Sequence, residues 1–133
     1  MSNEPKVWVV DDDDDDQYLI CSAFIELVPP VRVKSFYNGA EVITHLKMVK
    51  TVPQLILLDL NMPGINGLDV LRQARAIPTY QEVPIIILTT SFHSADEEKA
   101  IELGATNLLL KPSTFDKLSA LVQQLVIKWE VAY

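Results

Sequence analysis

Apolar residues follow two alternating patterns along this chain. Short, nearly continuous apolar runs predict five β-strands, at residues 6–10, 31–36, 55–58, 83–88 and 107–110. Apolar residues three and four positions apart predict helices at residues 15–28, 40–48, 68–75 and 114–131, together with one that Ser94 caps and Gly104 ends. Strands that alternate with helices form βαβ units. The pattern therefore predicts an α/β fold, a doubly wound five-stranded parallel sheet flanked by five helices.

The starts of two helices carry capping signals. Ser94 is followed three residues later by Glu97, which is the pattern of a capping box. At the first helix, Asp15 or Asp16 is expected to help cap the N-terminus, because negative charge is favourable there.

Four of the predicted strands lead into polar residues. Asp11 and Asp12 follow the first strand, Asp59 follows the third, Thr89 follows the fourth and Lys111 follows the fifth. In an open parallel sheet the carboxyl ends of the strands lie along one edge, where ligands bind. These side chains are therefore expected to converge, although they are spread over 100 positions of the chain.

Three carboxylates at this edge predict a metal site. Asp11, Asp12 and Asp59 would repel one another and raise one another's pKa values unless a cation neutralised them. A site built from oxygen ligands favours a hard divalent ion, so we expect Mg²⁺, with Mn²⁺ able to substitute.

Composition and charge narrow the class of protein. A length of 133 residues with 49% hydrophobic and 22% charged residues is typical of one globular domain, so we expect a single domain over residues 1–133 with no output domain. A net charge of −7 disfavours nucleic acid as a partner. No apolar stretch approaches the roughly 20 residues needed to cross a membrane. With no secretion signal and a single cysteine, Cys21, the cytoplasm is the expected location.

The strand-end motifs resemble those of a known family. They are an acidic pair in Val9-Val10-Asp11-Asp12, an aspartate in Leu57-Leu58-Asp59-Leu60-Asn61-Met62-Pro63-Gly64, a hydroxyl in Ile87-Leu88-Thr89, and Leu110-Lys111-Pro112. In this order and spacing they resemble the receiver domain of two-component response regulators, specifically a stand-alone receiver of the chemotaxis-protein kind. The resemblance covers nearly the whole chain and implies the flavodoxin-like strand order 2-1-3-4-5.

The resemblance also implies a role for each site residue. Asp59 would be the phosphoacceptor, taking a phosphoryl group from a sensor histidine kinase or phosphotransfer protein, with Thr89 and Lys111 as the other catalytic groups. Asp12, Asp59 and the backbone carbonyl of Asn61 would bind the metal directly, and Asp11 would act from the outer shell through water. The protein would catalyse only its own phosphorylation and dephosphorylation, so it is expected to be a regulator rather than an enzyme.

Two further expectations concern the geometry and the switch. The resemblance implies a cis peptide bond before Pro112. It also implies that Thr89 moves towards the phosphoryl group and that an aromatic residue rotates into the vacated space. This chain has Leu108 at the aromatic position, so Thr89 and Leu108 would form an altered switch. The fourth helix, fifth strand and fifth helix would form the face that binds an unknown downstream protein, and we expect a monomer or weak dimer.

Other functions agree less well with the residues. A flavodoxin would need a Ser/Thr/Gly-rich phosphate loop where this chain has six aspartates, at residues 11–16. A haloacid-dehalogenase-like phosphatase would need a second acid at position 61, where Asn61 stands, and an EF-hand would need a glycine within the acidic run. The remaining rival is a receiver that has lost phosphorylation and acts only as a binding module.

Overall fold

The computed structural model describes residues 5–48 and 51–131. Within these residues, five strands form one parallel sheet. Its order is β2-β1-β3-β4-β5, so the predicted fold class and strand order are confirmed. The strands span β1 Val7–Val10, β2 Val33–Phe36, β3 Leu55–Leu58, β4 Ile85–Thr89 and β5 Asn107–Leu110.

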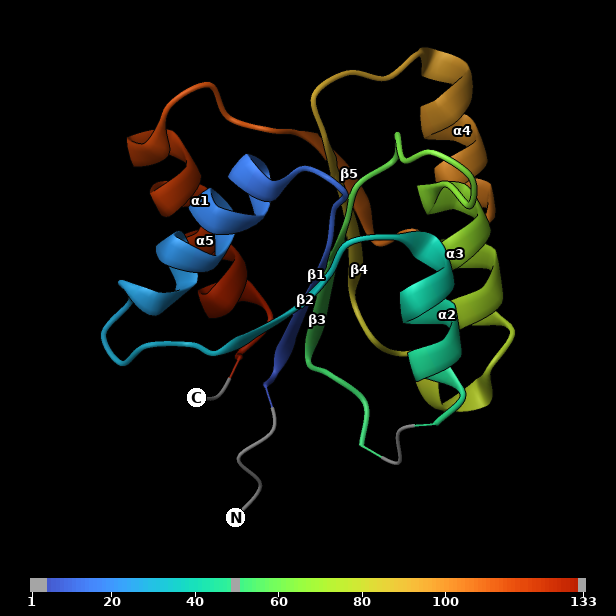
Figure 1. The fold of residues 1–133 in the computed structure, drawn as a ribbon, viewed down its shortest axis with the longest axis horizontal. Helices are drawn as coiled ribbons and strands as arrows, with labels where there is room; N and C mark the ends of the chain where they lie inside the picture. The colour runs from blue at the N-terminus through green and yellow to red at the C-terminus, as the bar shows by residue number, and fades with distance from the viewer. Residues whose placement is uncertain (1–4, 49–50, 132–133) are drawn as a thin grey trace.

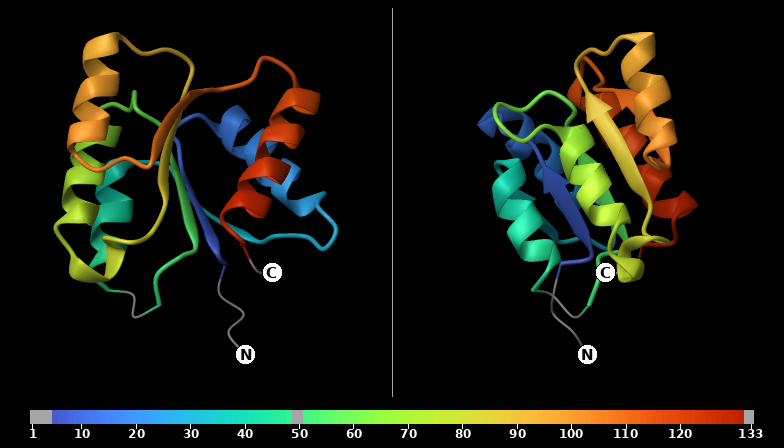
Figure 2. Two further views of the ribbon diagram at one scale, coloured as in Figure 1. Left: turned by 180° about the vertical axis from the view of Figure 1, so that it is seen from behind. Right: turned by 90° about the vertical axis from the view of Figure 1, so that its right-hand side faces the viewer.

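Five α-helices cover the two faces of the sheet. Helices α1 and α5 pack together on one face, and α2, α3 and α4 lie on the other (Figures 1 and 2). The helices span α1 Asp14–Ile25, α2 Gly39–Leu46, α3 Gly67–Arg75, α4 Ser94–Glu102 and α5 Phe115–Lys128, and a short 3-10 helix, η1, spans Pro78–Tyr80. This arrangement is the doubly wound architecture that the alternating pattern predicts.

The central strands β1, β3 and β4 are buried along their whole length. Alternate residues of these strands point to opposite faces, so the sheet separates two apolar clusters. Val10 and Leu58 belong to the cluster under α2, α3 and α4, whereas Val9 and Leu57 belong to the cluster under α1 and α5. Each buried aliphatic side chain contributes roughly 1.5–3 kcal/mol. The strands therefore form a rigid support for the residues that follow them.

Both capping predictions are wrong by one or more residues. Helix α1 is capped by Asp13, whose side chain accepts a hydrogen bond from the Asp16 amide at 2.9 Å. Helix α4 begins at Ser94 with His93 as the N-cap residue, and the His93 amide donates to the Asp96 carboxylate at 3.0 Å. In an acidic or polar run several side chains have capping chemistry, and the tertiary position of the strand end decides which one is used.

The expected cis bond before Pro112 is wrong for this structure. Among the described residues the cis peptide bond joins Val28 to Pro29, and Lys111–Pro112 is not cis. The trans form is the intrinsic preference of X–Pro bonds. In this conformation the side chain of Lys111 already reaches the acidic residues at the sheet edge.

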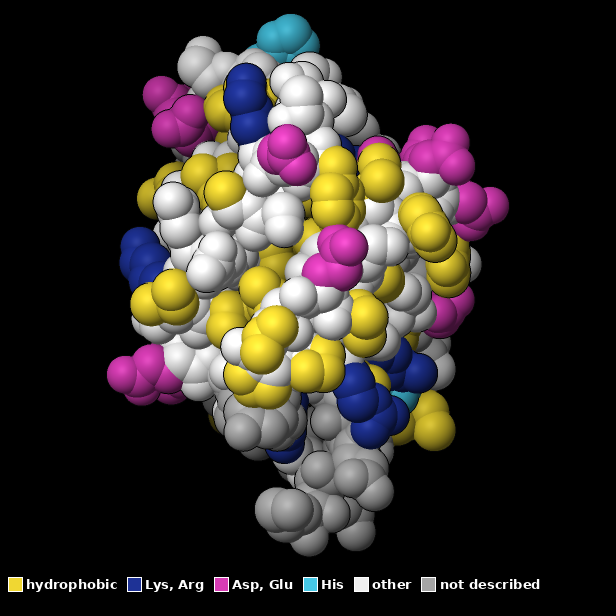
Figure 3. All heavy atoms as spheres, turned by 90° about the vertical axis from the view of Figure 1, so that its left-hand side faces the viewer, with side chains coloured by type: hydrophobic (Ala, Val, Ile, Leu, Met, Phe, Trp, Pro, Cys, Tyr) yellow, Lys and Arg dark blue, Asp and Glu magenta, His cyan; other side chains and the backbone are white. Residues whose placement is uncertain are grey.

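Several large apolar side chains lie at the surface. Figure 3 shows the side of the molecule formed by α1 and α5, where apolar groups are interspersed with acidic ones; the exposed apolar residues on these helices and the loop after α1 include Tyr18, Ile25, Val28 and Ile127. Ile101 of α4 and Leu110 of β5 are also more than half exposed. Within the described residues, no helix has the length and hydropathy needed to cross a membrane.

Candidate functional site

Hydrogen bonds beyond the regular strands fix the residues at the carboxyl edge of the sheet. The Asp59 amide donates to the Val10 carbonyl at 2.8 Å, and the Asp11 amide donates to the Phe36 carbonyl at 3.0 Å. On the other side, the Lys111 amide donates to the Thr89 carbonyl at 2.7 Å. The main chain therefore continues the sheet hydrogen bonding for one residue past these strand ends. The backbone position of each functional residue is fixed as a result.

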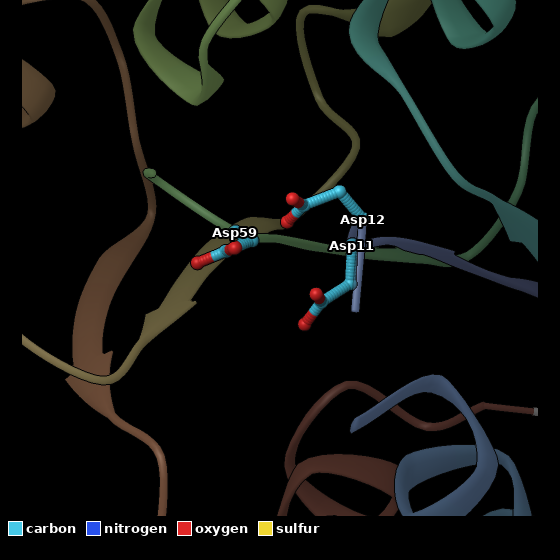
Figure 4. Close-up of side chains that lie close together, drawn as sticks. All are labelled: Asp11, Asp12 and Asp59. Carbon is cyan, nitrogen blue, oxygen red and sulfur yellow. The ribbon is translucent and has the colours of Figure 1, made fainter. Parts of the chain in front are cut away.

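The predicted acidic residues come together at this edge. Asp11 and Asp12 extend from the end of β1 and Asp59 from the end of β3, with their side chains close together (Figure 4). One carboxylate oxygen from each lies within 4.8 Å of the others. Asp11 and Asp59 are buried, whereas Asp12 is exposed. The cluster therefore combines two desolvated carboxylates with one that is open to solvent.

Lys111 crosses from β5 to the acidic cluster. Its Nζ lies 2.6 Å from Asp11 Oδ2, 2.7 Å from Asp16 Oδ2 and 3.9 Å from Asp59 Oδ1. The Lys111 side chain is only 10% exposed, so these contacts form in a poorly solvated region, where charge-assisted hydrogen bonds are strong. Sequence analysis placed Lys111 here correctly, but it did not identify Asp16 as a partner.

Burial changes the pKa values of these groups. Desolvation raises the pKa of Asp59 to about 6; the ammonium of Lys111 opposes this shift, and the negative charge of Asp11 adds to it. Burial alone would lower the pKa of Lys111, but its hydrogen bonds to Asp11 and Asp16 outweigh that effect and raise it. Lys111 is therefore charged at neutral pH, and Asp59 is a more basic carboxylate than an exposed aspartate.

Thr89 and Asn61 are the remaining predicted site residues at the carboxyl edge of the sheet. Thr89, the last residue of β4, is fully buried, and its hydroxyl donates to the Ser91 carbonyl at 3.3 Å. The Asn61 amide group donates to the Thr89 hydroxyl at 3.2 Å and to the Ser91 carbonyl at 3.1 Å. The Thr89 hydroxyl thus belongs to a small polar network that joins the loop after β3 to the loop after β4.

Leu108 is the second residue of β5 and pairs with Ile87 of β4, two residues before Thr89. It is 8% exposed and belongs to the apolar cluster under α2, α3 and α4, which also contains Ile87 and Ala100. The residue at the predicted switch position is therefore packed inside the protein, next to the element that carries Thr89.

Gln17 is a second residue that sequence analysis missed. It is 1% exposed, and its Nε2 lies within 3.1 Å of the carbonyl oxygens of Val9, Asp11 and Phe36. A buried glutamine among carbonyl groups satisfies acceptors at the ends of β1 and β2. The only available signal was a polar residue on the inward stripe of the first helix, close to Ile20 and Ala23.

Gly67 allows α3 to start directly behind the loop that carries Asp59. Its amide donates to the Leu60 carbonyl at 3.0 Å. A Cβ atom at position 67 would collide with the backbone carbonyl oxygen of Asp59 and lie 2.9 Å from Leu60 Cα. Only glycine fits here without displacing the backbone of Asp59.

Gly67→Ala is therefore expected to destabilise the protein by about 2 kcal/mol, because overpacking forces backbone shifts, and to disturb the acidic cluster. Urea unfolding measures the first effect, and Mn²⁺ affinity measures the second. The control is Gly64→Asn. Gly64 has φ 74°, which Asn tolerates, and a Cβ atom there meets no heavy atom of the described residues within 4 Å. Equal stability of the two variants would contradict the prediction.

The acidic cluster fits a hard divalent cation. Asp11, Asp12, Asp16 and Asp59 carry four negative charges at this edge, and Lys111 contributes one positive charge. All ligand atoms offered are oxygens, which favours Mg²⁺ or Mn²⁺ over softer metals. The excess negative charge and the raised pKa of Asp59 are what a bound divalent ion would offset.

Comparison with known proteins agrees with the strand-end motifs. Residues 7–123 match the family model described as the response regulator receiver domain. The chain belongs to this family. Receiver domains are the signalling modules of two-component systems, so the prediction of the family is confirmed, and the chain is a regulator of this class.

Similar proteins include receivers with the same extent as this chain. The probable chemotaxis protein CheY of Rhizobium etli is 30% identical over 124 residues, which cover 92% of this chain and 93% of that protein. Longer relatives include the DNA-binding transcriptional regulator NtrC of Escherichia coli and of Salmonella typhimurium, which are 32% and 31% identical, and the chain spans 25% of their length.

Solved receiver structures superpose on most of the chain. The phosphorylated cyanobacterial phytochrome response regulator RcpA has 27% identity and a TM-score of 0.86, with 96% of this chain and 94% of that chain covered. The Mn²⁺-bound form of response regulator Rcp1 has 27% identity and a TM-score of 0.81, with 94% of each chain covered.

Proposed function

We propose that this receiver domain takes a phosphoryl group onto Asp59 and transmits a signal by changing which protein it binds. The observation that carries the proposal is the arrangement of Asp59, a buried carboxylate whose pKa is raised to about 6, beside the ammonium of Lys111. The donor would be the phosphohistidine of a sensor histidine kinase or phosphotransfer protein, or a small acyl phosphate. The domain would catalyse only its own phosphorylation and dephosphorylation.

In the proposed reaction a carboxylate oxygen of Asp59 attacks the phosphorus atom of the donor. A new P–O bond forms while the P–N bond of the phosphohistidine breaks, and the bonding electron pair leaves with the imidazole. The transferred group carries negative charge on its three outer oxygens, so catalysis depends on positioning and on positive charge. Lys111 would donate a charge-assisted hydrogen bond to one of these oxygens, and the Thr89 hydroxyl would donate to another.

Asp12, Asp59 and the backbone carbonyl of Asn61 would hold Mg²⁺ directly, with Asp11 acting through water and Mn²⁺ able to substitute. When bound, the ion would neutralise the carboxylates and one phosphoryl oxygen. The acidic cluster and the Mn²⁺-bound state of the similar regulator Rcp1 support this assignment.

The signal would pass from Thr89 to the face formed by α4, β5 and α5. To reach a phosphoryl oxygen, the Thr89 hydroxyl would leave the Ser91 carbonyl and Asn61. Leu108, which pairs with Ile87 on the neighbouring strand, would repack in place of the ring rotation that an aromatic residue would make. The partially exposed apolar side chains Ile101 and Leu110 lie on this face and suit a downstream protein partner rather than nucleic acid.

The proposal is tested by incubating the protein with Mg²⁺ and acetyl phosphate and measuring its intact mass. We expect the native chain to gain one phosphoryl group and Asp59→Asn to gain none, because the amide is not a nucleophile of this kind. Excess EDTA is expected to suppress the gain.

Asp15→Asn provides a matched control for the loss of one aspartate, because Asp15 is exposed in the first turn of α1. If the native chain takes no phosphoryl group from acetyl phosphate or from any histidine kinase, the proposal is wrong, and the alternative is a receiver that acts only as a binding module.

A further inference from the structure

Asp16 contacts the amine of the site from outside the motifs that define it. Its Oδ2 lies 2.7 Å from Lys111 Nζ, although 95 positions separate the two residues. The Asp16 carboxylate is 31% exposed and the Lys111 side chain is 10% exposed. The contact therefore differs from an ordinary surface ion pair, in which both groups are well solvated and the pair contributes little.

The backbone of Asp16 is itself held in place. Its amide donates to the side chain of Asp13, the N-cap residue of α1, at 2.9 Å. The next residue of α1, Gln17, ties the helix to the carbonyl groups of β1 and β2. The carboxylate of Asp16 is thus presented from a fixed first turn, and Lys111 reaches it from the end of β5.

Two carboxylates hold the ammonium from two elements. Asp11 accepts from it on the β1 side at 2.6 Å, and Asp16 accepts from it on the α1 side at 2.7 Å. An ammonium has three N–H donors, so one remains for the direction of Asp59, whose Oδ1 lies 3.9 Å away. Contact with a phosphoryl oxygen on Asp59 therefore does not require Asp16 to release the ammonium.

We propose that Asp16 is a positioning residue for phosphoryl transfer, which fixes Lys111 so that its remaining N–H donor faces Asp59. This inference rests on the proposed function. A lysine side chain has a flexible four-carbon stem, and its freedom must be restricted before it can hold a transferring group. The ion pair between Asp16 and Lys111, at 2.7 Å, supplies that restriction.

The test compares initial rates of phosphorylation by acetyl phosphate with saturating Mg²⁺, measured by intact mass. Asp16→Ala is expected to be about five- to tenfold slower than the native chain. A displacement of about 1 Å can cost roughly 10²-fold, but Asp11 still holds the ammonium at 2.6 Å in this variant, which limits the loss. Asp16→Asn keeps an acceptor within reach of Lys111 and is expected to restore most of the rate. Asp15→Ala removes a charge from the same helical turn without the contact to Lys111 and is expected to keep the native rate.

A double-mutant cycle separates this role from a purely structural one. In the Lys111→Met background, Asp16→Ala is expected to have no further effect on the rate, because the group that it positions is gone. Asp16→Ser is a second variant, for use if Asp16→Ala fails to fold. Its side chain is too short to reach the ammonium, so the same slowing is expected.

Each other outcome overturns the inference. If Asp16→Ala and Asp16→Ser react as fast as the native chain or faster, Asp16 does not position Lys111 productively. If Asp15→Ala slows the reaction as much as Asp16→Ala does, the effect comes from overall charge. If Asp16→Ala slows the Lys111→Met variant as much as it slows the native chain, Asp16 does not act through Lys111. A native chain that takes no phosphoryl group overturns the proposed function as well, whereas a phosphorylated native chain with an unaffected Asp16 series overturns only this inference.

Discussion

Asp59→Asn is expected to stabilise the metal-free protein at pH 7 by about 2–3 kcal/mol. The pKa of Asp59 rises from its ordinary value of 3.8 to about 6 on folding, mainly because the carboxylate loses its hydration. A tenfold change in proton affinity corresponds to roughly 1.4 kcal/mol. The ionised carboxylate therefore costs the folded state this free energy at neutral pH, and an uncharged amide of similar shape removes the cost.

The pH dependence of the effect follows from the direction of the shift. Below about pH 4 the carboxyl group is protonated in both the folded and the unfolded protein, so its favourable contribution to stability is fully present. That contribution is lost as the pH rises towards the folded-state pKa of about 6. The difference in stability between Asp59→Asn and the native chain is thus expected to be small at pH 4 and to grow up to about pH 7.

Urea unfolding in EDTA at a series of pH values measures this difference. Asp15→Asn is the control, because Asp15 is an exposed carboxylate of the same acidic run and its removal should change stability by less than about 0.5 kcal/mol. An Asp59→Asn variant that is less stable than the native chain at pH 7, or equally stabilised at pH 4 and pH 7, would contradict the argument. Added Mg²⁺ should stabilise the native chain more than the variant, since a ligand that binds only the folded state raises its stability.

The strand-end residues could be predicted because their positions depend on short local patterns. Each apolar run is followed at once by its functional residue, as Leu58 is by Asp59, so a parallel sheet brings these residues to one edge whatever the intervening loops do. Hydrogen bonds between the strands fix how they align at that edge. The local sequence is enough to locate the start and end of each strand within a few residues.

The partners of Lys111 could not be predicted in the same way. Six consecutive aspartates offer the same chemistry, and only the path of the chain from β1 into α1 decides that Asp13 caps the helix and Asp16 reaches the ammonium. The peptide bond before Pro112 likewise depends on packing around the loop, because the intrinsic difference between its isomers is about 0.5–1 kcal/mol. Contacts between residues far apart in the chain, and choices that depend on small energy differences, cannot be predicted from local sequence patterns.

Arg75→Met is expected to lower the free energy of unfolding by about 3 kcal/mol, since three carbonyl acceptors, two of them in partly buried contacts, lose a charged donor. The Arg75 guanidinium donates to the carbonyl groups of Gly104, Tyr80 and Val83, at distances from 2.5 to 2.9 Å. Tyr80 ends η1 and Val83 lies between η1 and β4, whereas Gly104 lies between α4 and β5. One side chain at the end of α3 therefore holds two connections at the amino edge of the sheet.

Arg72→Met is the matched control, because Arg72 lies one turn earlier on the same helix. Its ion pair with Asp69 at 3.5 Å is formed by side chains that are 57% and 42% exposed, and such pairs contribute less than about 1 kcal/mol. Urea unfolding of the two variants should therefore separate them clearly, and equal midpoints would show that the Arg75 contacts contribute no more than a surface pair. Because the contacts of Arg75 lie at the opposite edge of the sheet from Asp59, the folded Arg75→Met protein should react with acetyl phosphate at the native rate, so stability and phosphorylation are expected to change independently.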